Sequence, residues 1–155
     1  MENSPKNKKP GKIWKVILII FCALALTCLI AVFADAPGRK EIQQLALSGG
    51  FGELKDGTYI GEYIGTKSHV RDTRLEVQIS GGEISDVKIV KGAIDKEGKP
   101  IIIRNGKSVQ DIFNEVKSKR TLQVDVISGA TITSKAHLKA LENALEQAMV
   151  KQTDN

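Results

Sequence analysis

The stretch LEVQISGGEISDVKIV, residues 75–90, decides the fold of this 155-residue chain. Its first part, Leu75 to Ser80, alternates apolar and polar residues, the period-two pattern of a half-buried strand. Ser80-Gly81-Gly82-Glu83 predicts a tight reversal, and Ile84 to Val90 continues as a second apolar run. The stretch therefore predicts an antiparallel hairpin.

Further strands are predicted on both sides of this hairpin. Thr58 to Ile64 is rich in β-forming residues and follows Asp56-Gly57, a pair typical of turns. Leu122 to Ile127 is a short run that we also expect to be a strand. Together with the hairpin, these segments predict a small, mainly antiparallel sheet.

Two helices are predicted after the hairpin. Ser108 can cap a helix that runs to about Lys119, and residues 132–147 have apolar side chains at helical spacing. The apolar faces comprise Val109, Ile112, Phe113 and Val116 in the first helix and Leu138, Leu141, Leu145 and Ala148 or Met149 in the second. Strands that come first and helices that come late are typical of an α+β domain, with helices packed on one side of the sheet.

The turn before the last helix is the segment most suited to bind a ligand. Asp125-Val126-Ile127-Ser128-Gly129-Ala130-Thr131 ends in small residues and a hydroxyl group at the predicted start of the helix. The first N–H groups of a helix lack partners and its dipole favours negative charge, so a phosphate suits this position. The structural alternative is that Thr133 or Ser134 simply caps the helix.

Three segments of the chain resemble the FMN-binding domain family, which occurs in the G-type subunits of Rnf complexes and the C-type subunits of sodium-translocating NADH:quinone oxidoreductases. They are Asp56-Gly57-Thr58-Tyr59-x-Gly61, the hairpin, and SGATITSKAHLKALENA at residues 128–144. The resemblance covers about residues 54–149. Residues 91–98 lack the acidic and threonine-containing segment of the longer subunits, so the chain looks like a compact, stand-alone version.

This resemblance implies that FMN is attached covalently, through a phosphoester to Thr131. A separate flavin transferase that uses FAD as its donor would form this bond outside the cytoplasm. The implied recognition segment consists of Asp125, Ser128, Gly129 and Ala130. We also expect cofactor contacts from Thr133, Ser134, Gly57 and Tyr59. For Tyr59, and for Tyr63 on the same strand, the alternative to a place beside the flavin ring is packing on the sheet.

An apolar run near the beginning of the chain predicts a membrane anchor. Between residues 13 and 33 the only charged residue is Lys15, and about 21 residues of helix span roughly 32 Å, enough for a bilayer core. Under the positive-inside rule, the lysine-rich residues 1–12 stay in the cytoplasm and the domain is exported. Two alternatives are a signal peptide cleaved after Ala36 and a lipid anchor on Cys28.

The basic charge of the chain lies mainly before and within this run. Five of the 23 basic residues, but only one of the 18 acidic residues, lie in the first 15 positions. The remainder is nearly neutral, whereas a nucleic-acid-binding domain needs a basic face, so we expect no nucleic-acid partner. Both cysteines, Cys22 and Cys28, lie in the apolar run, which leaves the predicted exported part without a disulfide or a thiolate metal site. Redox chemistry there requires a cofactor.

No further motif indicates an enzyme. Asn105-Gly106-Lys107-Ser108 lacks the first glycine of a phosphate-binding loop, and the chain has no Gly-x-Ser-x-Gly motif. His69 and His137 stand apart, and we expect each at the surface or in packing rather than on a metal. We therefore expect no metal site and no independent catalytic activity.

The predicted organisation is a cytoplasmic basic tail (1–12), a transmembrane helix (13–33), a flexible linker (34–55) and an FMN-binding domain (56–149). We expect an extracytoplasmic, membrane-anchored flavoprotein that relays electrons between a redox donor in the membrane and an acceptor at its outer face. The expected partners are these redox proteins, the flavin transferase and the lipid bilayer. The alternative is a non-enzymatic accessory or sensor module that binds FMN non-covalently or scaffolds a membrane redox complex.

Overall fold

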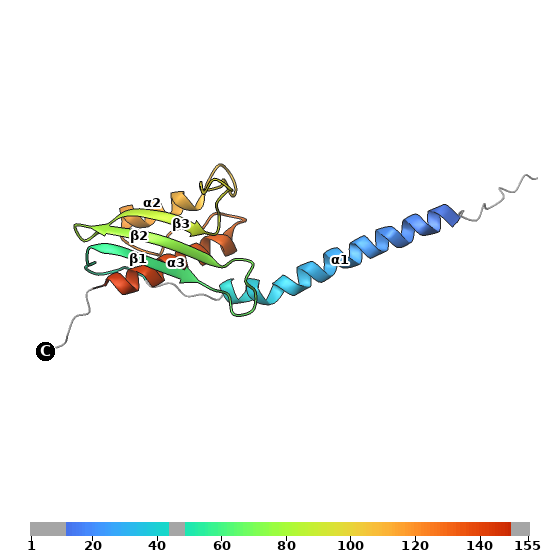
Figure 1. Ribbon diagram of the computed structural model, residues 1–155, viewed down its shortest axis with the longest axis horizontal. Helices are drawn as coiled ribbons and strands as arrows, with labels where there is room; N and C mark the ends of the chain where they lie inside the picture. Colours follow the sequence, from blue (N-terminus) through green and yellow to red (C-terminus); the bar gives the residue numbers. More distant parts are fainter. Residues whose placement is uncertain (1–11, 44–48, 150–155) are drawn as a thin grey trace, which may run out of the picture. The chain divides into compact units, whose positions relative to one another are not determined.

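The structure is a computed structural model in which residues 12–43 and 49–149 are described (Figure 1). In chain order its elements are α1 (Lys12–Gln43), β1 (Gly57–Tyr63), β2 (Thr73–Ser80), β3 (Glu83–Lys91), α2 (Val109–Lys119) and α3 (Thr131–Ala148). The chain divides into two units, Met1–Ala36 and Pro37–Asn155, and the second unit contains an α+β domain.

The first part of α1 exposes apolar side chains. Every residue from Trp14 to Ile30 is exposed, with Trp14 at 68% and Phe21 at 74%. None of the helices within the described ranges is both long and apolar enough for a membrane crossing. The transmembrane segment expected over residues 13–33 therefore stays a prediction.

The sheet is antiparallel and has the order β1-β2-β3, which confirms the predicted hairpin. Tyr59 lies opposite Val77, and Val77 lies opposite Val87 on the third strand. Alternate side chains of β2 are buried, as expected for a strand with one face against the core. The sequence period thus determines which face of the sheet packs inward.

The turn between β2 and β3 depends on two glycines and one carboxylate. Gly81 and Gly82 have φ angles of 63° and 74°, a left-handed conformation that glycine adopts without steric cost. The carboxylate of Asp56 accepts their N–H groups at 3.0 and 2.9 Å. These bonds, that of Gly82 first, lower the pKa of Asp56. Asp56 therefore ties the start of β1 to the hairpin.

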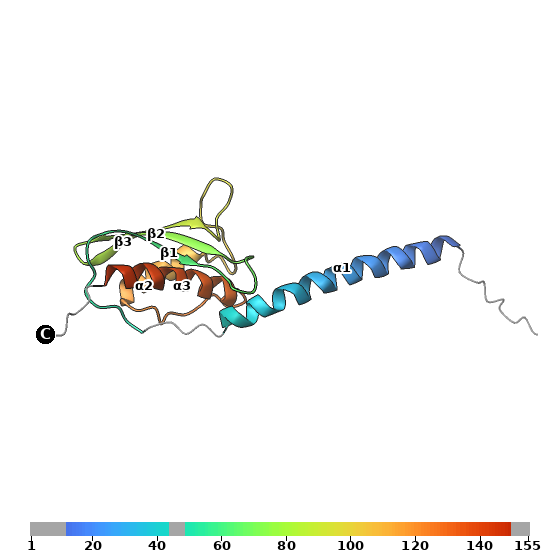
Figure 2. The same cartoon turned by 60° about the horizontal axis from the view of Figure 1, so that its bottom comes forward.

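Helices α2 and α3 lie on the same side of the sheet, as predicted (Figure 2). Helix α3 packs on β1 and β2, and α2 packs on β3 and α3. At Gly61 an added Cβ would lie 1.9 Å from the carbonyl oxygen of Ala140, so β1 and α3 are in direct backbone contact. Both predicted apolar faces are buried: Val109, Ile112, Phe113 and Val116 in α2, and Leu138, Leu141, Leu145 and Ala148 in α3.

Parts of the segment that precedes β1 belong to the core of the domain. Ile42, at the end of α1, is 2% exposed, and Leu54 is 3% exposed. Residues 44–48, which the sequence assigns to the flexible linker, lie outside the described residues. Ile42 and Leu54, within the predicted linker of residues 34–55, are therefore anchored in the domain.

The prediction of a strand over residues 122–127 is wrong. The segment joins no sheet among the described residues, although the N–H of Leu122 donates to the carbonyl of Gly49 at 2.9 Å. Leu122 and Ile127 are buried in the core. Apolar packing therefore holds this connection without strand pairing. The prediction failed because β-propensity reflects a half-buried surface more than a specific partner strand.

Candidate functional site

The turn before α3 has a conformation that requires glycine. Gly129 has φ of 76°, and the N–H of Ala130 donates to the carbonyl of Ile127 at 2.8 Å. An added Cβ at Gly129 would lie 2.8 Å from Cδ and Nε of Arg104. The left-handed backbone therefore favours glycine here, whereas the exposed Arg104 side chain could shift to admit a larger residue.

Ser134 closes this turn from the first turn of α3. Its side chain is fully buried, its hydroxyl donates to the carbonyl of Ala130 at 3.0 Å, and it accepts the N–H of Ile127 at 3.3 Å. Ser134 is one of the residues expected to contact the cofactor. In the structure its hydroxyl holds the shape of the turn and lines none of the cavities described below.

Thr131 is the first residue of α3 and is half-buried. The N–H of Ser134 is bonded to Ala130, so the three preceding N–H groups lie in the part of the helix that has no intrahelical acceptors. These N–H groups form the positive end of the helix dipole. This position favours an anion next to the Thr131 hydroxyl.

A cavity of about 300 Å³ adjoins this helix end, and we call it the Thr131 cavity. It is lined by Gly129, Ala130, Thr131, Ile132, Thr133, Arg39 and Arg71. The two arginines come from distant segments, the end of α1 and the loop between β1 and β2. Two threonines at a helix N-terminus and two arginines thus line one space, and residues of these types suit a phosphate.

A second cavity of about 300 Å³ shares Arg71 and Thr133 with the first, and we call it the His137 cavity. Its other lining residues are Val70, Asp72, Thr73, Gly92, Ala93, Ile101, Ile103, Ala136 and His137. Aliphatic side chains predominate in this list. The two cavities are therefore neighbours of different character, one basic and one largely apolar.

His137 forms the wall of the His137 cavity that lies between α3 and the end of β3. Its ring is 2% exposed, Nδ1 lies 2.8 Å from the carbonyl oxygen of Thr133, and Nε2 accepts the N–H of Ala93 at 3.1 Å. These contacts require the neutral ring with the proton on Nδ1. Burial lowers the pKa of His137, and the Thr133 carbonyl partly opposes the shift. Of the two expected roles, at the surface or in packing, His137 has the second.

A close approach at Gly92 shapes the same wall. Gly92 has φ of 138°, and an added Cβ would lie 2.5 Å from Nε2 of His137. The imidazole therefore occupies the space that a side chain at this position would need.

The other histidine, His69, is exposed at 71%, and its Nδ1 lies 3.4 Å from Oδ1 of Asp72. Among the described residues, no group of three or more histidine, cysteine or acidic side chains is placed to hold a metal.

The structure brings together only part of the predicted site. Gly129, Ala130, Thr131 and Thr133 line the Thr131 cavity. Asp125 and Ser128 line a separate cavity of about 420 Å³, beside Lys107 and residues of α2. The recognition segment is therefore divided between two surfaces of the turn.

Gly57 and Tyr59 lie near the opposite end of α3. The N–H of Lys55 donates to the carbonyl of Ala148 at 2.8 Å, and the Tyr59 hydroxyl donates to the carbonyl of Lys55 at 3.0 Å. Since α3 has 18 residues, its two ends are separated by roughly 27 Å. The structure does not bring this pair together with Thr131.

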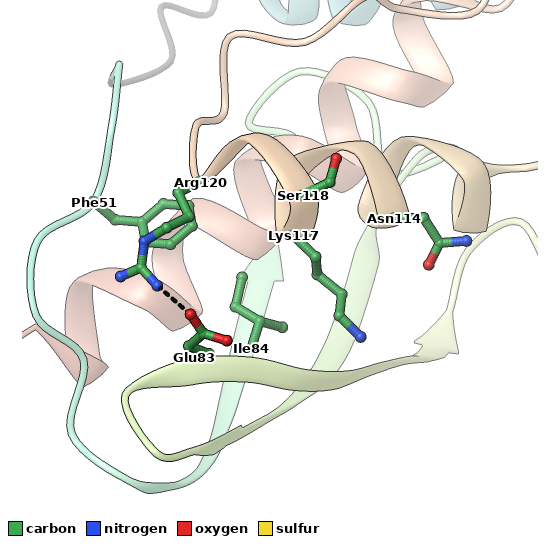
Figure 3. Close-up of a pocket in the computed structure, with 7 residues that line it drawn as sticks. All are labelled: Phe51, Glu83, Ile84, Asn114, Lys117, Ser118 and Arg120. Carbon is green, nitrogen blue, oxygen red and sulfur yellow. Dashed lines mark hydrogen bonds and ion pairs between the residues drawn. The ribbon is translucent and has the colours of Figure 1, made fainter.

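Another cavity, of about 290 Å³, lies at the C-terminal end of α2 (Figure 3). In it, Arg120 pairs with Glu83 at 3.1 Å and lies 5.8 Å from the centre of the Phe51 ring. None of the predicted cofactor residues lines this space. The residues that sequence analysis missed lie elsewhere, at Arg39 and Arg71, and no local motif marks either of them.

Comparison with known proteins identifies one family. A family model described as the FMN-binding domain matches residues 69–146. The matched region contains β2, β3, α2, the turn at Gly129 and all of α3 up to Glu146. No curated protein matches the chain.

Proposed function

The chain belongs to the FMN-binding domain family, and from this premise we propose that it carries FMN as a phosphoester on Thr131 and transfers electrons. The observation that carries the proposal is the placement of Thr131. Its position at a helix N-terminus, in one cavity with Arg39 and Arg71, suits an anionic ester.

The residues present fit FMN as a whole. The Thr131 cavity offers cations and helix N–H groups to a phosphate, and the adjoining His137 cavity offers Val70, Ile101 and Ile103 to a flat, largely apolar ring. Gly92 brings backbone against this space, where any side chain would collide with His137. When bound, FMN supplies reversible one- and two-electron chemistry that the side chains of this domain do not provide.

Attachment requires a group transfer that the domain alone does not catalyse. In the proposed reaction the Thr131 oxygen forms a bond to the phosphorus of the FMN half of FAD. The pyrophosphate bond breaks, AMP leaves, and the hydroxyl proton is released. A separate flavin transferase catalyses this step, and the domain contributes an acceptor hydroxyl that Gly129 and Ala130 leave accessible.

The proposal includes a membrane tether and an extracytoplasmic domain. It is supported by the apolar residues of α1 from Trp14 to Ile30, which are exposed in the isolated chain, and by the lysines that precede them. Covalent attachment suits this location, since a flavin held by equilibrium binding alone would be lost to the medium. The expected partners are a membrane redox donor and an acceptor at the outer face.

The test is to express the full chain with and without a flavin transferase and to examine denatured protein for flavin fluorescence. Fluorescence should stay with the wild-type band only when the transferase is present, and Thr131→Ala should abolish it. Thr133→Ala removes a hydroxyl from the same cavity and is the matched control, which should still be labelled. Flavin that leaves the wild-type chain on denaturation would refute covalent attachment and favour a non-covalent accessory or sensor module.

A further inference from the structure

We propose that the last residues of α1, Gly38 to Ile42, belong to the flavin site, and that Arg39 binds the phosphate of FMN attached to Thr131. This inference rests on the proposed function and extends it. The sequence assigns residues 34–55 to a linker, and the matched family region begins only at residue 69. Arg39 nevertheless lines the Thr131 cavity.

Specific contacts hold this segment on the domain. The carboxylate of Glu41 accepts the N–H groups of Thr66 and Lys67 at 3.0 and 3.2 Å, and these bonds, with Thr66 first, lower its pKa. Ile42 is 2% exposed and belongs to the hydrophobic core. Glu41 and Ile42 therefore hold the last residues of the helix on the domain, and Arg39 lies less than one helical turn before them.

A glycine strengthens the case for a defined docking position. Gly38 is buried, and an added Cβ would lie 2.4 Å from the Cβ of Ser68 in the loop between β1 and β2. This loop also carries Arg71, the second arginine of the cavity. Docking of the segment on the loop therefore brings two arginines to the lining of one cavity.

The chemistry of the ester explains why two arginines suit this space. A phosphate joined to both riboflavin and Thr131 is a diester with a single negative charge and two free oxygens. A guanidinium group presents paired N–H donors that match such oxygens, and these charge-assisted bonds are stronger than neutral ones. Arg39 and Arg71 can therefore bind the diester from the segment and from the domain, while the N-terminus of α3 contributes its N–H groups.

The adjacent lysine provides an internal control. Lys40 is exposed and does not line the Thr131 cavity, because neighbouring residues of a helix point about 100° apart. Arg39→Gln and Lys40→Gln remove the same charge from the same turn. Only the first change should affect the flavin site, whereas a general effect of charge near the domain would appear in both variants.

The experiment uses the full chain in detergent, FAD and a flavin transferase, and measures the initial rate at which flavin becomes covalently attached. Loss of one charge-assisted contact should slow Arg39→Gln about tenfold, while Lys40→Gln should match the wild type. Arg39→Lys should recover part of the rate. Glu41→Gln, which weakens docking but leaves Arg39 in place, should also slow attachment.

A second measurement separates a contact with phosphate from a structural effect. After attachment is driven to completion, the phosphorus NMR signal of the diester should move in Arg39→Gln and keep its wild-type position in Lys40→Gln. A wild-type chain that is labelled while Arg39→Gln and Lys40→Gln agree in rate and in phosphorus shift overturns this inference and leaves the proposed function intact. A wild-type chain that never acquires covalent flavin overturns both.

Discussion

Acidification should destabilise the domain through His137. In the folded chain the buried ring donates from Nδ1 to Thr133 and accepts the N–H of Ala93 on Nε2, an arrangement only the neutral ring can make. Burial lowers the pKa of His137 below the ordinary value of histidine, about 6.5. The unfolded chain therefore binds a proton at a higher pH than the folded chain does.

The sign and size of the effect follow from this difference. Above about pH 6.5 both states are neutral at this residue, and the free energy of unfolding is unaffected. As the pH falls below that value, the unfolded state gains a proton that the folded state excludes, so stability falls by up to about 1.4 kcal/mol per pH unit. The loss ends when the pH reaches the folded pKa. Arg71 and Asp72 also line the His137 cavity, and Asp72 has a lowered pKa and stays ionised over this window.

The assay is urea unfolding of the full chain at about pH 7.5 and about pH 5.5, with His137→Gln as the comparison. Glutamine keeps an acceptor for Ala93 but does not titrate, so the wild type should lose up to about 1.4 kcal/mol more than the variant between these two conditions. Ring resonances of His137, read beside those of the exposed His69, report the folded pKa directly. Equal losses in both proteins, or titration of the folded His137 ring at or above pH 6.5, would refute the reasoning.

Three further predictions concern packing, the turn and topology. Gly61→Ala should lower the free energy of unfolding by about 3 kcal/mol or more in a urea titration, because its Cβ would collide with a backbone oxygen of α3. Gly52→Ala, with open space around it, should change the free energy of unfolding little in the same titration. Ser134→Ala should cost about 1–3 kcal/mol in a thermal or urea melt, since it leaves the buried N–H of Ile127 without its acceptor; a variant as stable as the wild type would contradict the role given to that hydroxyl. A cysteine at the exposed Ser118, in a chain whose native cysteines are replaced, should react with an impermeant thiol reagent on intact cells; labelling only after lysis would overturn the extracytoplasmic orientation.

Features that depend on neighbouring residues could be predicted from the sequence. The hairpin follows from the period of its apolar residues and the two glycines at its turn, and the structure has both. Ser108 is the N-cap of α2 as expected, and the carboxylate of Asp111 accepts its N–H and hydroxyl at 2.7 and 3.0 Å. The start of α3 at Thr131 follows in the same way from the small residues before it.

Features that depend on distant segments could not be predicted. Arg39 and Arg71 line the Thr131 cavity together only because the end of α1 docks on the loop after β1. No local sequence pattern predicts that docking. Tyr59 was expected beside the flavin because its segment resembles the family, yet the direction of β1 along α3 brings it to the far end of the helix. Residues 122–127 have the composition of a strand, but tertiary packing decides their role.

The bond between Ser134 and Ile127 has a consequence for the order of events during biogenesis. It joins a residue inside α3 to one before the turn, so formation of the helix adds a bond that stabilises the turn. A peptide of residues 125–131 lacks that serine and the helix N-terminus, and it should be a poor acceptor of flavin. Under the proposed function, the transferase would therefore act on a folded epitope, and loading with FMN would report that the domain has completed its fold.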